Sequence, residues 1–276
     1  HWVRRHVIHG SSAVDVLWID EIGQLDIELL AALSRLTFLG TQLIISGDFN
    51  QFAPIGNAYR GQAVGEDVFA RSRLLHTMAG GNRLHLTECK RSDDVLFRFY
   101  TRLIPGGDLF GMPVATAVAQ ARNRFTYKGV AELNLVLSHR KRVQLNKQCD
   151  LHFRPAAGAV YLPCPLQKRV ALNAPQAMWV WGGQKLLGCV PIERQGIRNG
   201  CEYTVAAVDE TSVTLENGPA LTHEQAVAWL RLPYAMTYAS VQGRETEGTL
   251  CLHDSSNRHM SLKHLYVGLS RAKRAS

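Results

Sequence analysis

Two short stretches of the sequence decide its fold class: AVDVLWIDE at residues 13–21 and LIISGDFNQ at residues 43–51. Each begins as a continuous apolar run rich in β-branched residues, which is typical of a strand buried inside a parallel sheet. Each run then ends in acidic residues, Asp20-Glu21 in the first stretch and Asp48 in the second. In open α/β sheets, ligands bind beyond the carboxyl ends of the strands, so both acidic turns fall at the expected binding edge.

The residues between the two strands predict a helix. Asp26 is a suitable N-cap, and Gly40 suits the C-terminal end. Leucines recur between them at helical spacing: Leu29, Leu33 and Leu36. Strand, helix and strand together make a βαβ unit, so we expect an α/β fold with a parallel sheet.

The middle of the chain alternates between helical and strand patterns. Residues 65–110 look helical, with breaks near Gly80-Gly81 and at the Pro-Gly-Gly sequence of residues 105–107. Residues 132–137 (ELNLVL) predict another buried strand, and a helix comes next through Arg140–Phe153.

Between residues 160 and 230 the composition changes. Prolines and glycine pairs separate short apolar runs, which predicts short antiparallel strands. The runs are Met178–Trp181, Tyr203–Val208 and Ser212–Leu215. We interpret this region as a small β-barrel insertion, after which the α/β pattern returns at residues 233–276.

The composition limits the classes of function. The 276 residues carry a net charge of +8 and a pI of about 9.3, which favours polyanionic partners without identifying them. The six cysteines are scattered without metal-site spacing, so we expect reduced thiols. No apolar run approaches the ~18 residues of a membrane span. We therefore expect an intracellular, soluble protein without membrane contact, in the nucleus if it is eukaryotic and otherwise in the cytoplasm.

The acidic turns suit the chemistry of ATP hydrolysis. Asp20 could hold Mg²⁺ through water, and its neighbour Glu21 could act as the base that orients the attacking water. Gln51 offers an amide that could sense a γ-phosphate. For an isolated Asp-Glu pair, the alternative is a solvated turn.

Both turns resemble known motifs. The sequence Gly47–Ile55 (GDFNQFAPI) resembles the third motif of superfamily 1 helicases, and Ile19-Asp20-Glu21 resembles the second; the RecD/Pif-like branch is the best match. Leu86–Asp93 resembles the next element of that branch, in which an arginine, here Arg91, reaches the γ-phosphate. Taken alone, Arg91 would be a surface charge.

Later segments resemble further motifs in the expected order. Tyr234–Glu245 is similar to the fifth motif, which contacts DNA and nucleotide, and Leu265–Ala272 is similar to the sixth, with Arg271 as its arginine finger. Ser138–Asn146 resembles the opening of the second RecA-like domain, and Gly196–Gly200 resembles a turn of the inserted barrel.

The chain departs from the family pattern in two places. Ala239-Ser240-Val241 stands where the branch usually has His-Lys-Ser, which puts the DNA contact of this loop in doubt. Glu245 stands where the branch commonly has threonine, and a contact to the ribose is possible there. The sequence also contains no G-x-x-x-x-G-K-S/T phosphate loop, because none of its lysines comes directly after a glycine. We expect that loop upstream of His1, and negligible ATPase activity from the 276 residues alone.

The resemblance implies the remaining site residues. Nucleotide contacts are expected from Asp20, Gly47, Asp48, Gln242, Gly243 and Glu245. Nucleic-acid contacts are expected from Phe52, Pro54, Tyr59, Arg140, Lys141, Thr237 and Tyr238, through phosphate contacts and base stacking. For each of these the alternative is a solvated helix face or core packing.

The resemblance implies two RecA-like P-loop NTPase domains, the first of them partial, with ATP and Mg²⁺ as cofactors. The first would span residues 1–130, the second residues 131–170 and 228–276, and the barrel insertion residues 171–227. The implied function is an ATP-dependent DNA helicase motor, acting as a monomer and moving 5′ to 3′ on single-stranded DNA.

Two alternatives remain open. One is a viral-type superfamily 1 RNA helicase. The other is a non-catalytic nucleic-acid-binding remnant of a helicase.

Overall fold

The computed structural model describes residues 7, 14–54, 56–59, 61–65, 68, 70–126, 129–164 and 176–275, without the side chain of Tyr59. The chain divides into two compact units. Unit 1 is His1–Gly111 with Leu262–Leu269, and unit 2 is Met112–Ser261 with Ser270–Ser276. Among the described residues, no helix is both long enough and apolar enough to cross a membrane.

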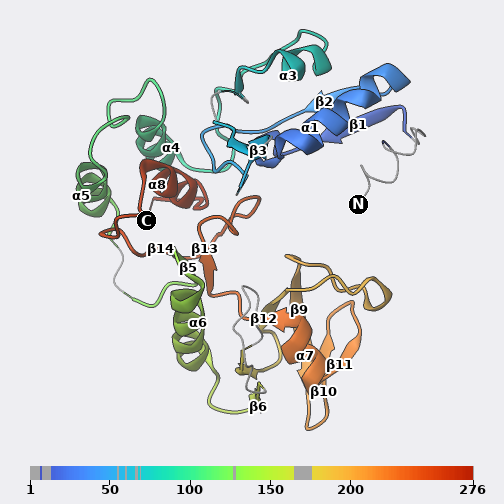
Figure 1. Cartoon of the computed structure of the whole chain (residues 1–276). Helices are drawn as coiled ribbons and strands as arrows, with labels where there is room; N and C mark the ends of the chain where they lie inside the picture. Colours follow the sequence, from blue (N-terminus) through green and yellow to red (C-terminus); the bar gives the residue numbers. More distant parts are fainter. Residues whose placement is uncertain are drawn as a thin grey trace. The chain divides into compact units, whose positions relative to one another are not determined.

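Unit 1 contains the predicted βαβ unit (Figure 1). Strand β1 (Val16–Ile19) pairs in parallel with β2 (Gln42–Ile45), and helix α1 (Ile27–Ser34) and the 3-10 helix η3 (Arg35–Leu39) connect them. The predicted caps are confirmed: the Asp26 carboxylate accepts a hydrogen bond from the Leu29 amide, and Gly40 has a left-handed φ of 81°. Helix α1 buries Leu30 and Leu33 and η3 buries Leu36 in the core next to the sheet, whereas Leu29 is only partly covered.

The remainder of unit 1 is mostly helical. Strands β3 (Ala58–Tyr59) and β4 (Gln62–Ala63) form a short hairpin. The other elements are η2 (Ile22–Gln24), α3 (Arg73–Met78), α4 (Asp94–Tyr100), η4 (Thr101–Leu103) and α8 (Leu262–Leu269). Helix α8 packs against α4 and η4, so the chain returns to unit 1 near its C-terminal end.

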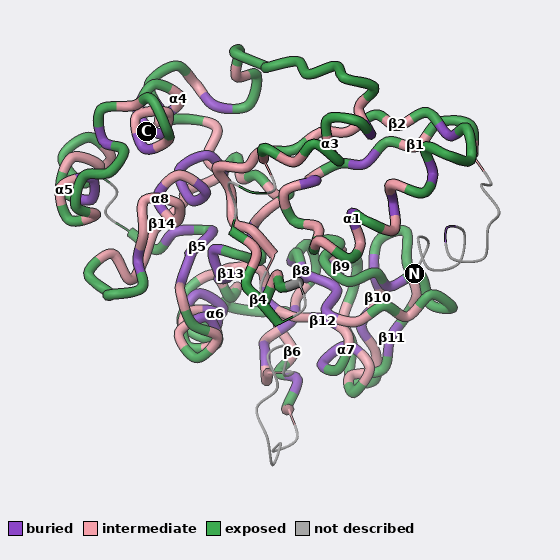
Figure 2. Tube along the Cα trace, turned by 45° about the horizontal axis from the view of Figure 1, so that its top comes forward, coloured by how far each residue is buried: buried purple, intermediate pink, exposed green. Residues whose placement is uncertain are grey.

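Unit 2 is built on a three-stranded parallel sheet in the order β13-β5-β14. Its strands are β5 (Leu133–Val136), β13 (Ala235–Thr237) and β14 (Leu250–Leu252). The predicted strand at residues 132–137 is therefore confirmed, and it lies in the centre. All four residues of β5 are buried, whereas β1 and β2 each leave alternate side chains exposed (Figure 2). Helix α5 (Val114–Arg124) precedes this sheet in the chain, and helix α6 (His139–Phe153) packs on β5 and β13.

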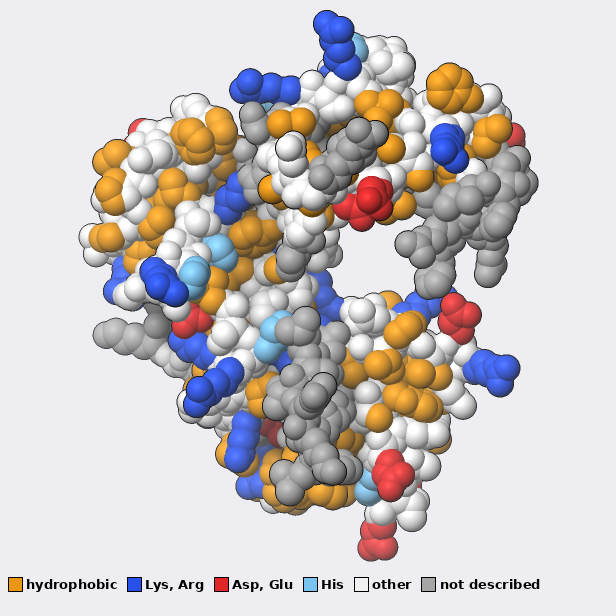
Figure 3. All heavy atoms as spheres, in the orientation of Figure 1, with side chains coloured by type: hydrophobic (Ala, Val, Ile, Leu, Met, Phe, Trp, Pro, Cys, Tyr) orange, Lys and Arg blue, Asp and Glu red, His pale blue; other side chains and the backbone are white. Residues whose placement is uncertain are grey.

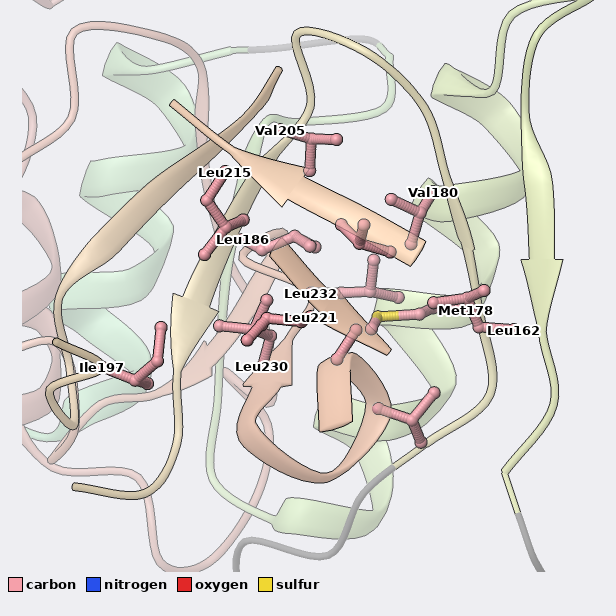
Figure 4. Close-up of a cluster of buried hydrophobic side chains, with 13 residues drawn as sticks. Leu162, Met178, Val180, Leu186, Ile197, Val205, Leu215, Leu221, Leu230 and Leu232 are labelled. Carbon is pink, nitrogen blue, oxygen red and sulfur yellow. The ribbon is translucent and has the colours of Figure 1, made fainter. Parts of the chain in front are cut away.

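A second sheet of unit 2 is antiparallel, in the order β11-β10-β9-β8-β12. Its strands are β8 (Lys185–Gly188), β9 (Glu202–Val208), β10 (Ser212–Leu215), β11 (Ala220–Thr222) and β12 (Leu230–Arg231). Helix α7 (His223–Trp229) and the pair β6 (Val160–Leu162) and β7 (Met178–Val180) cover it. Thirteen buried side chains form its core (Figure 4). The predicted antiparallel strands are confirmed. In the described part of the chain the sheet is open, so its closure into a barrel stays a prediction.

Asp150, near the end of α6, joins the helix to the β6-β7 and antiparallel layers. One oxygen of its carboxylate accepts a hydrogen bond from the Trp179 amide at 2.8 Å, and the other accepts one from Gln184 Nε2 at 3.3 Å. The side chain is 3% exposed. Burial raises the pKa of the Asp150 carboxyl to about 6.

The two units differ from the domains expected from the sequence. Residues 112–130 group with unit 2, and α8 groups with unit 1. Helix α8 groups with unit 1 because its side chains bind the turn that comes after β2.

Candidate nucleotide site

The parallel register of β1 and β2 brings the two predicted acidic turns together. Ile19 is paired with Ile45, so Asp20 and Ser46 are the first residues beyond the two strands. The Ser46 hydroxyl donates a hydrogen bond to Asp20 Oδ1 at 2.7 Å, and Trp18 Nε1 donates to the same hydroxyl at 2.9 Å. The two turns are therefore side by side in unit 1, as the sequence predicted for a βαβ edge.

The turn after β1 has an unusual backbone at Glu21. This residue has φ 53° and ψ 44°, a left-handed conformation that residues other than glycine seldom adopt. Such positions cost on the order of 1 kcal/mol and persist where the surroundings hold them. The amides of neighbouring residues do so here, because Glu21 N–H donates to Asp20 Oδ1 and Ile22 N–H donates to the Ser46 carbonyl.

Gly47 is required by close approach of the two turns. A Cβ at this position would lie 2.8 Å from both the backbone nitrogen and Cγ2 of Ile22. Contacts of that length do not occur with real side chains, so a larger residue would force the two turns apart. The glycine of the Gly-Asp motif thus sets the spacing between the two acidic turns.

Asp48 orders its own turn. Its Oδ1 accepts hydrogen bonds from the amide and the side chain of Asn50, and its Oδ2 accepts one from the Tyr266 hydroxyl at 2.6 Å. Lys263 Nζ donates to the Gln51 carbonyl at 3.1 Å, and the ring of Phe52 lies edge-on to His264 at 4.7 Å. Helix α8 therefore holds the turn that carries Gln51.

Tyr266 also connects this turn to the segment that carries Arg91. Its ring packs edge-on against Tyr100 of α4 at 5.6 Å. The Tyr100 hydroxyl lies 3.2 Å from Cys89 Sγ, and the Ser92 amide donates to the same sulfur. Burial raises the pKa of Tyr100 to about 12, so its hydroxyl stays protonated. The exposed Arg91 thus belongs to a segment fixed through α4 and α8 to the Asp48 turn.

The exposed donor set at the β1–β2 edge suits a hydrated Mg²⁺ ion. Asp20 is exposed, and only its Oδ1 is engaged by neighbours among the described residues. Its second oxygen and the half-buried Glu21 carboxylate are the hard oxygen ligands that Mg²⁺ accepts, directly or through water. In the described part of the chain no lysine or arginine forms an ion pair with either carboxylate. The residues therefore fit one side of a Mg²⁺–nucleotide complex.

The candidate residues of unit 2 are engaged in internal contacts. Glu245 pairs with Lys273 at 3.1 Å, and Gly243 has a φ of 75° in the loop between β13 and β14. Arg271 is 1% exposed; it donates to the Arg244 carbonyl at 3.1 Å and to the Ser270 hydroxyl at 2.9 Å. In this structure the Arg271 guanidinium is thus part of the unit's interior.

Thr237 and Tyr238 are also buried in this structure, and their nucleic-acid contacts stay a prediction. The Thr237 hydroxyl bonds Ser240, and the Tyr238 hydroxyl donates to the His253 carbonyl at 2.8 Å. Tyr238 is 1% exposed. Tyr238 comes directly after β13, and its position in this structure is that of a core-packing residue.

The remaining nucleic-acid candidates are more accessible. Arg140 is exposed on α6, while Lys141 pairs with Asp254 at 2.5 Å. On the face shown in Figure 3, lysine and arginine side chains gather over this helix. Phe52 and Pro54 are half-buried in unit 1, and the side chain of Tyr59 lies outside the described residues.

Sequence reasoning missed three residues of the unit 1 site: Ser46, Tyr266 and Lys263. Ser46 could have been found, since it is the polar residue that ends the second apolar strand. Tyr266 and Lys263 lie more than 200 positions from the turn that they bind, and no local pattern marks such a contact.

Comparison with known proteins shows the fold. No family model matches the sequence, and no curated protein matches it significantly. Solved structures do. Bacteroides Pif1 bound to single-stranded DNA is 14% identical over 95% of this chain and 71% of its own, with a TM-score of 0.58. Its complex with ADP-AlF3 and single-stranded DNA gives 14% identity, coverage of 96% and 71%, and the same TM-score.

Pif1 helicase from Candida albicans is 16% identical over 95% of this chain and 73% of its own, with a TM-score of 0.53. The chain has the fold of a Pif1 helicase. This mixed α/β fold is that of RecA-like helicase domains, in agreement with the resemblance seen in the sequence. At these identities the likeness concerns the fold, and site and function rest on the residues themselves.

Proposed function

We propose that this chain is part of an ATP-dependent DNA helicase motor that moves along single-stranded DNA. The observation that carries the proposal is the placement of Asp20-Glu21 and Gly47-Asp48 side by side beyond two parallel strands, in a fold shared with Pif1 helicases. One of those structures holds ADP-AlF3 and single-stranded DNA together. The family direction, 5′ to 3′, and the division into two RecA-like domains with a barrel insertion are parts of the same proposal.

Each residue of the unit 1 site has a role in this proposal. Glu21 takes the proton of the attacking water, and Gln51 senses the γ-phosphate. Asp20 holds Mg²⁺ through water, and the bound ion neutralises phosphate charge during the reaction. Arg91 and Arg271 are the cations that stabilise the transferring phosphoryl group; Arg271 would have to leave its present hydrogen bonds to act.

Hydrolysis also requires a phosphate loop, which the sequence does not contain. Without the amides and the lysine of such a loop, nothing cradles the β- and γ-phosphates. We therefore propose that a loop from outside these 276 residues completes the site. The part of the function that the chain can perform by itself is nucleic-acid binding.

The test is binding of a labelled oligothymidylate, monitored by fluorescence anisotropy as salt is raised. We expect weak binding that falls steeply with salt, because contacts to phosphates release counterions. Arg140→Ala and Lys147→Ala, both exposed on α6, should each reduce the slope of log K against log salt by about 0.7. Lys90→Ala is the matched control, since this exposed lysine of unit 1 pairs with Glu88.

Two results would contradict the proposal: absence of binding at low ionic strength, or an affinity that does not change with salt. An RNA strand of matched sequence separates the two nucleic acids. Tighter binding of RNA would favour the viral-type RNA helicase.

A further inference from the structure

Unit 2 contains a group of basic side chains that the proposed function does not use. We call His139, Arg142, Arg231 and Arg244 the basic cluster. His139 and Arg142 lie on the first turn of α6, Arg231 ends β12, and Arg244 comes after Gly243 in the loop beyond β13. Arg244 Nη2 would lie 3.7 Å from a Cβ on Gly200, the Gly200 amide donates to the Gly188 carbonyl, and Gly188 pairs with Leu230, next to Arg231. After burial itself, the charges of Arg142 and Arg231 lower the pKa of His139, and the charge of Arg231 lowers the pKa of Arg142.

Arg142 is the most unusual member of the basic cluster. It is 3% exposed, and its guanidinium Nε is buried without a hydrogen-bond partner among the described residues. An arginine cannot escape this position by losing its proton, because its pKa is too high. A buried, uncompensated charge is among the most destabilising features a fold can contain. The buried Nε of Arg142 is therefore a donor that an anion could satisfy.

Two other atoms of the basic cluster are also buried without a hydrogen-bond partner among the described residues: His139 Nδ1 and Arg244 Nη2. The guanidinium nitrogen is a donor in every state. The imidazole nitrogen donates in one of its two neutral tautomers. Two of the three unpaired atoms thus belong to the first turn of the 15-residue helix α6, and the third belongs to the loop beyond β13. The first amides of a helix favour negative charge as well.

Among the described residues, two ionisable groups near Arg142 and Arg244 are not free anions. Glu202 is near Arg244 but is paired with Lys185 at 2.8 Å. Cys189 is the ionisable group near both Arg142 and Arg231. Burial nevertheless raises the pKa of its thiol, so the sulfur is neutral at physiological pH.

We propose that the basic cluster binds a phosphate group. A planar guanidinium fork can bind two phosphate oxygens at once, and a phosphate has enough acceptor oxygens for donors that come from more than one side chain. The phosphate could belong to a nucleic-acid backbone or be free inorganic phosphate; both present the same oxygens. The basic cluster of unit 2 supports this site independently of the helicase proposal.

The experiment measures thermal stability of the 276-residue chain in phosphate and in chloride at matched ionic strength. Phosphate should raise the Tm of the wild-type chain by several degrees, because a ligand bound only by the folded state stabilises it. Arg142→Met removes the charge and keeps the volume of the side chain. This variant should lose most of the phosphate-dependent rise, and in chloride it should melt at or above the wild-type temperature, since an unpaired buried charge is gone.

Arg194→Met is the matched control, because Arg194 is an exposed arginine of the same unit with no assigned role; it should keep the full rise. Arg244→Met provides a second variant if Arg142→Met does not fold, and should weaken phosphate binding by about tenfold or more. A second set of melting curves, measured with an oligothymidylate in phosphate-free buffer, shows whether the bound phosphate belongs to a nucleic-acid backbone or is free inorganic phosphate. The site is assigned to a phosphodiester if the oligothymidylate raises the wild-type Tm and inorganic phosphate does not. In that case the rise in Tm should be lost in Arg142→Met.

Protection by inorganic phosphate alone supports the site and assigns it to a free phosphate, while removing support for DNA binding. If neither ligand raises the wild-type Tm, the proposal is overturned. It is overturned equally if Arg142→Met and Arg244→Met respond as strongly as the wild type.

Discussion

Glu21 in unit 1 and Asp254 in unit 2 occupy equivalent places, two residues after the last residue of a parallel strand. Both have left-handed backbones, with φ of 53° and 63°. Their side chains nevertheless differ in surroundings. Lys141 and the Leu137 amide bind the Asp254 carboxylate, whereas in the described residues no cation pairs with Glu21. The backbone conformation is therefore the same for both acids. The neighbouring side chains decide whether such an acid is held in internal contacts or is left available to a ligand.

The neighbours differ because the adjacent strands lead into different segments. After β5 the chain enters α6, whose first turn carries Lys141 into reach of Asp254. After β2 it enters the Gly47–Phe52 turn, which carries no cation. Four predictions test this contrast, from the largest expected effect to the smallest.

Glu21→Gln should abolish turnover while Asp254→Asn should not. In a polypeptide in which a phosphate loop precedes this sequence, we expect Glu21→Gln to lower kcat by about 10³-fold, because a proton acceptor is lost. Asp254→Asn, assayed below its melting temperature, should stay within about twofold of wild type on the same reasoning. Steady-state ATPase kinetics with DNA decide this. A near-normal kcat in a well-folded Glu21→Gln protein would show that Glu21 belongs to a solvated turn and has no role in hydrolysis.

The second prediction compares two arginines, the exposed Arg91 of unit 1 and the buried Arg271 of unit 2, through the variants Arg91→Ala and Arg271→Ala. Each should reduce kcat by about two orders of magnitude or more in the same polypeptide, with little change in nucleotide affinity. Lysine should rescue poorly, because a point charge does not reproduce the guanidinium fork. The double variant should be barely worse than either single one.

Their stabilities should differ. Arg91 is exposed, so Arg91→Ala should keep the wild-type Tm, whereas Arg271→Ala loses buried hydrogen bonds and should melt earlier. A normal kcat in folded Arg271→Ala would show that Arg271 is purely structural.

Asp254→Asn should instead lower the free energy of unfolding, by about 2 kcal/mol, because a partly buried carboxylate loses charge-assisted hydrogen bonds. Burial opposes ionisation, yet the Leu137 amide and Lys141 hold the pKa of Asp254 below its ordinary value. The stabilisation is therefore complete above the unfolded pKa of about 3.9 and is lost as the pH falls through the lower folded pKa. Denaturant titrations from pH 7 downward measure it. Equal stabilities of variant and wild type at pH 7 would refute this assignment.

Asp150→Asn should show the opposite pH dependence. Burial raises the pKa of Asp150 to about 6, so the wild-type chain loses stability as the pH rises from the unfolded pKa of about 3.9 through the folded value. The asparagine keeps an acceptor for the Trp179 amide without the charge. We expect the variant to be more stable than wild type by about 1 kcal/mol at pH 8 and to differ less at pH 5. Asp150→Ala should be destabilised at both pH values, since the hydrogen bonds themselves are lost. The expectation would be contradicted if the difference in stability between wild type and Asp150→Asn were the same at pH 5 and at pH 8.

Much of the fold could be predicted because its signals are local. The apolar strands, the Asp26 cap and Gly40 each depend on neighbours a few residues away, and α6 begins at His139, one residue from the predicted start. The predicted single helix after Asp26 instead tightens into η3 from Arg35. Helices α5 and α7 lie in segments for which no helix was predicted.

The site could be predicted only where a sequence motif lies at the end of a strand whose pairing brings it next to another motif. The Asp20-Glu21 and Gly47-Asp48 turns meet because parallel pairing places consecutive strand ends together. Burial of Arg271 and Tyr238, and the bond from Tyr266 to Asp48, depend on packing between segments distant in sequence. Charge and motif identity carry no information about such packing.

The contact between Gly47 and Ile22 has a consequence for signalling within the protein. The Ser46 amide donates to the Ile19 carbonyl, the Ile22 amide donates to the Ser46 carbonyl, and the glycine leaves no room between the two turns. Backbone therefore meets backbone here, and the Ile22 side chain packs directly against Gly47. A movement of the turn that carries Gln51, on gain or loss of a γ-phosphate, would be transmitted directly to Glu21. Sensing and hydrolysis would then be one mechanical event rather than two.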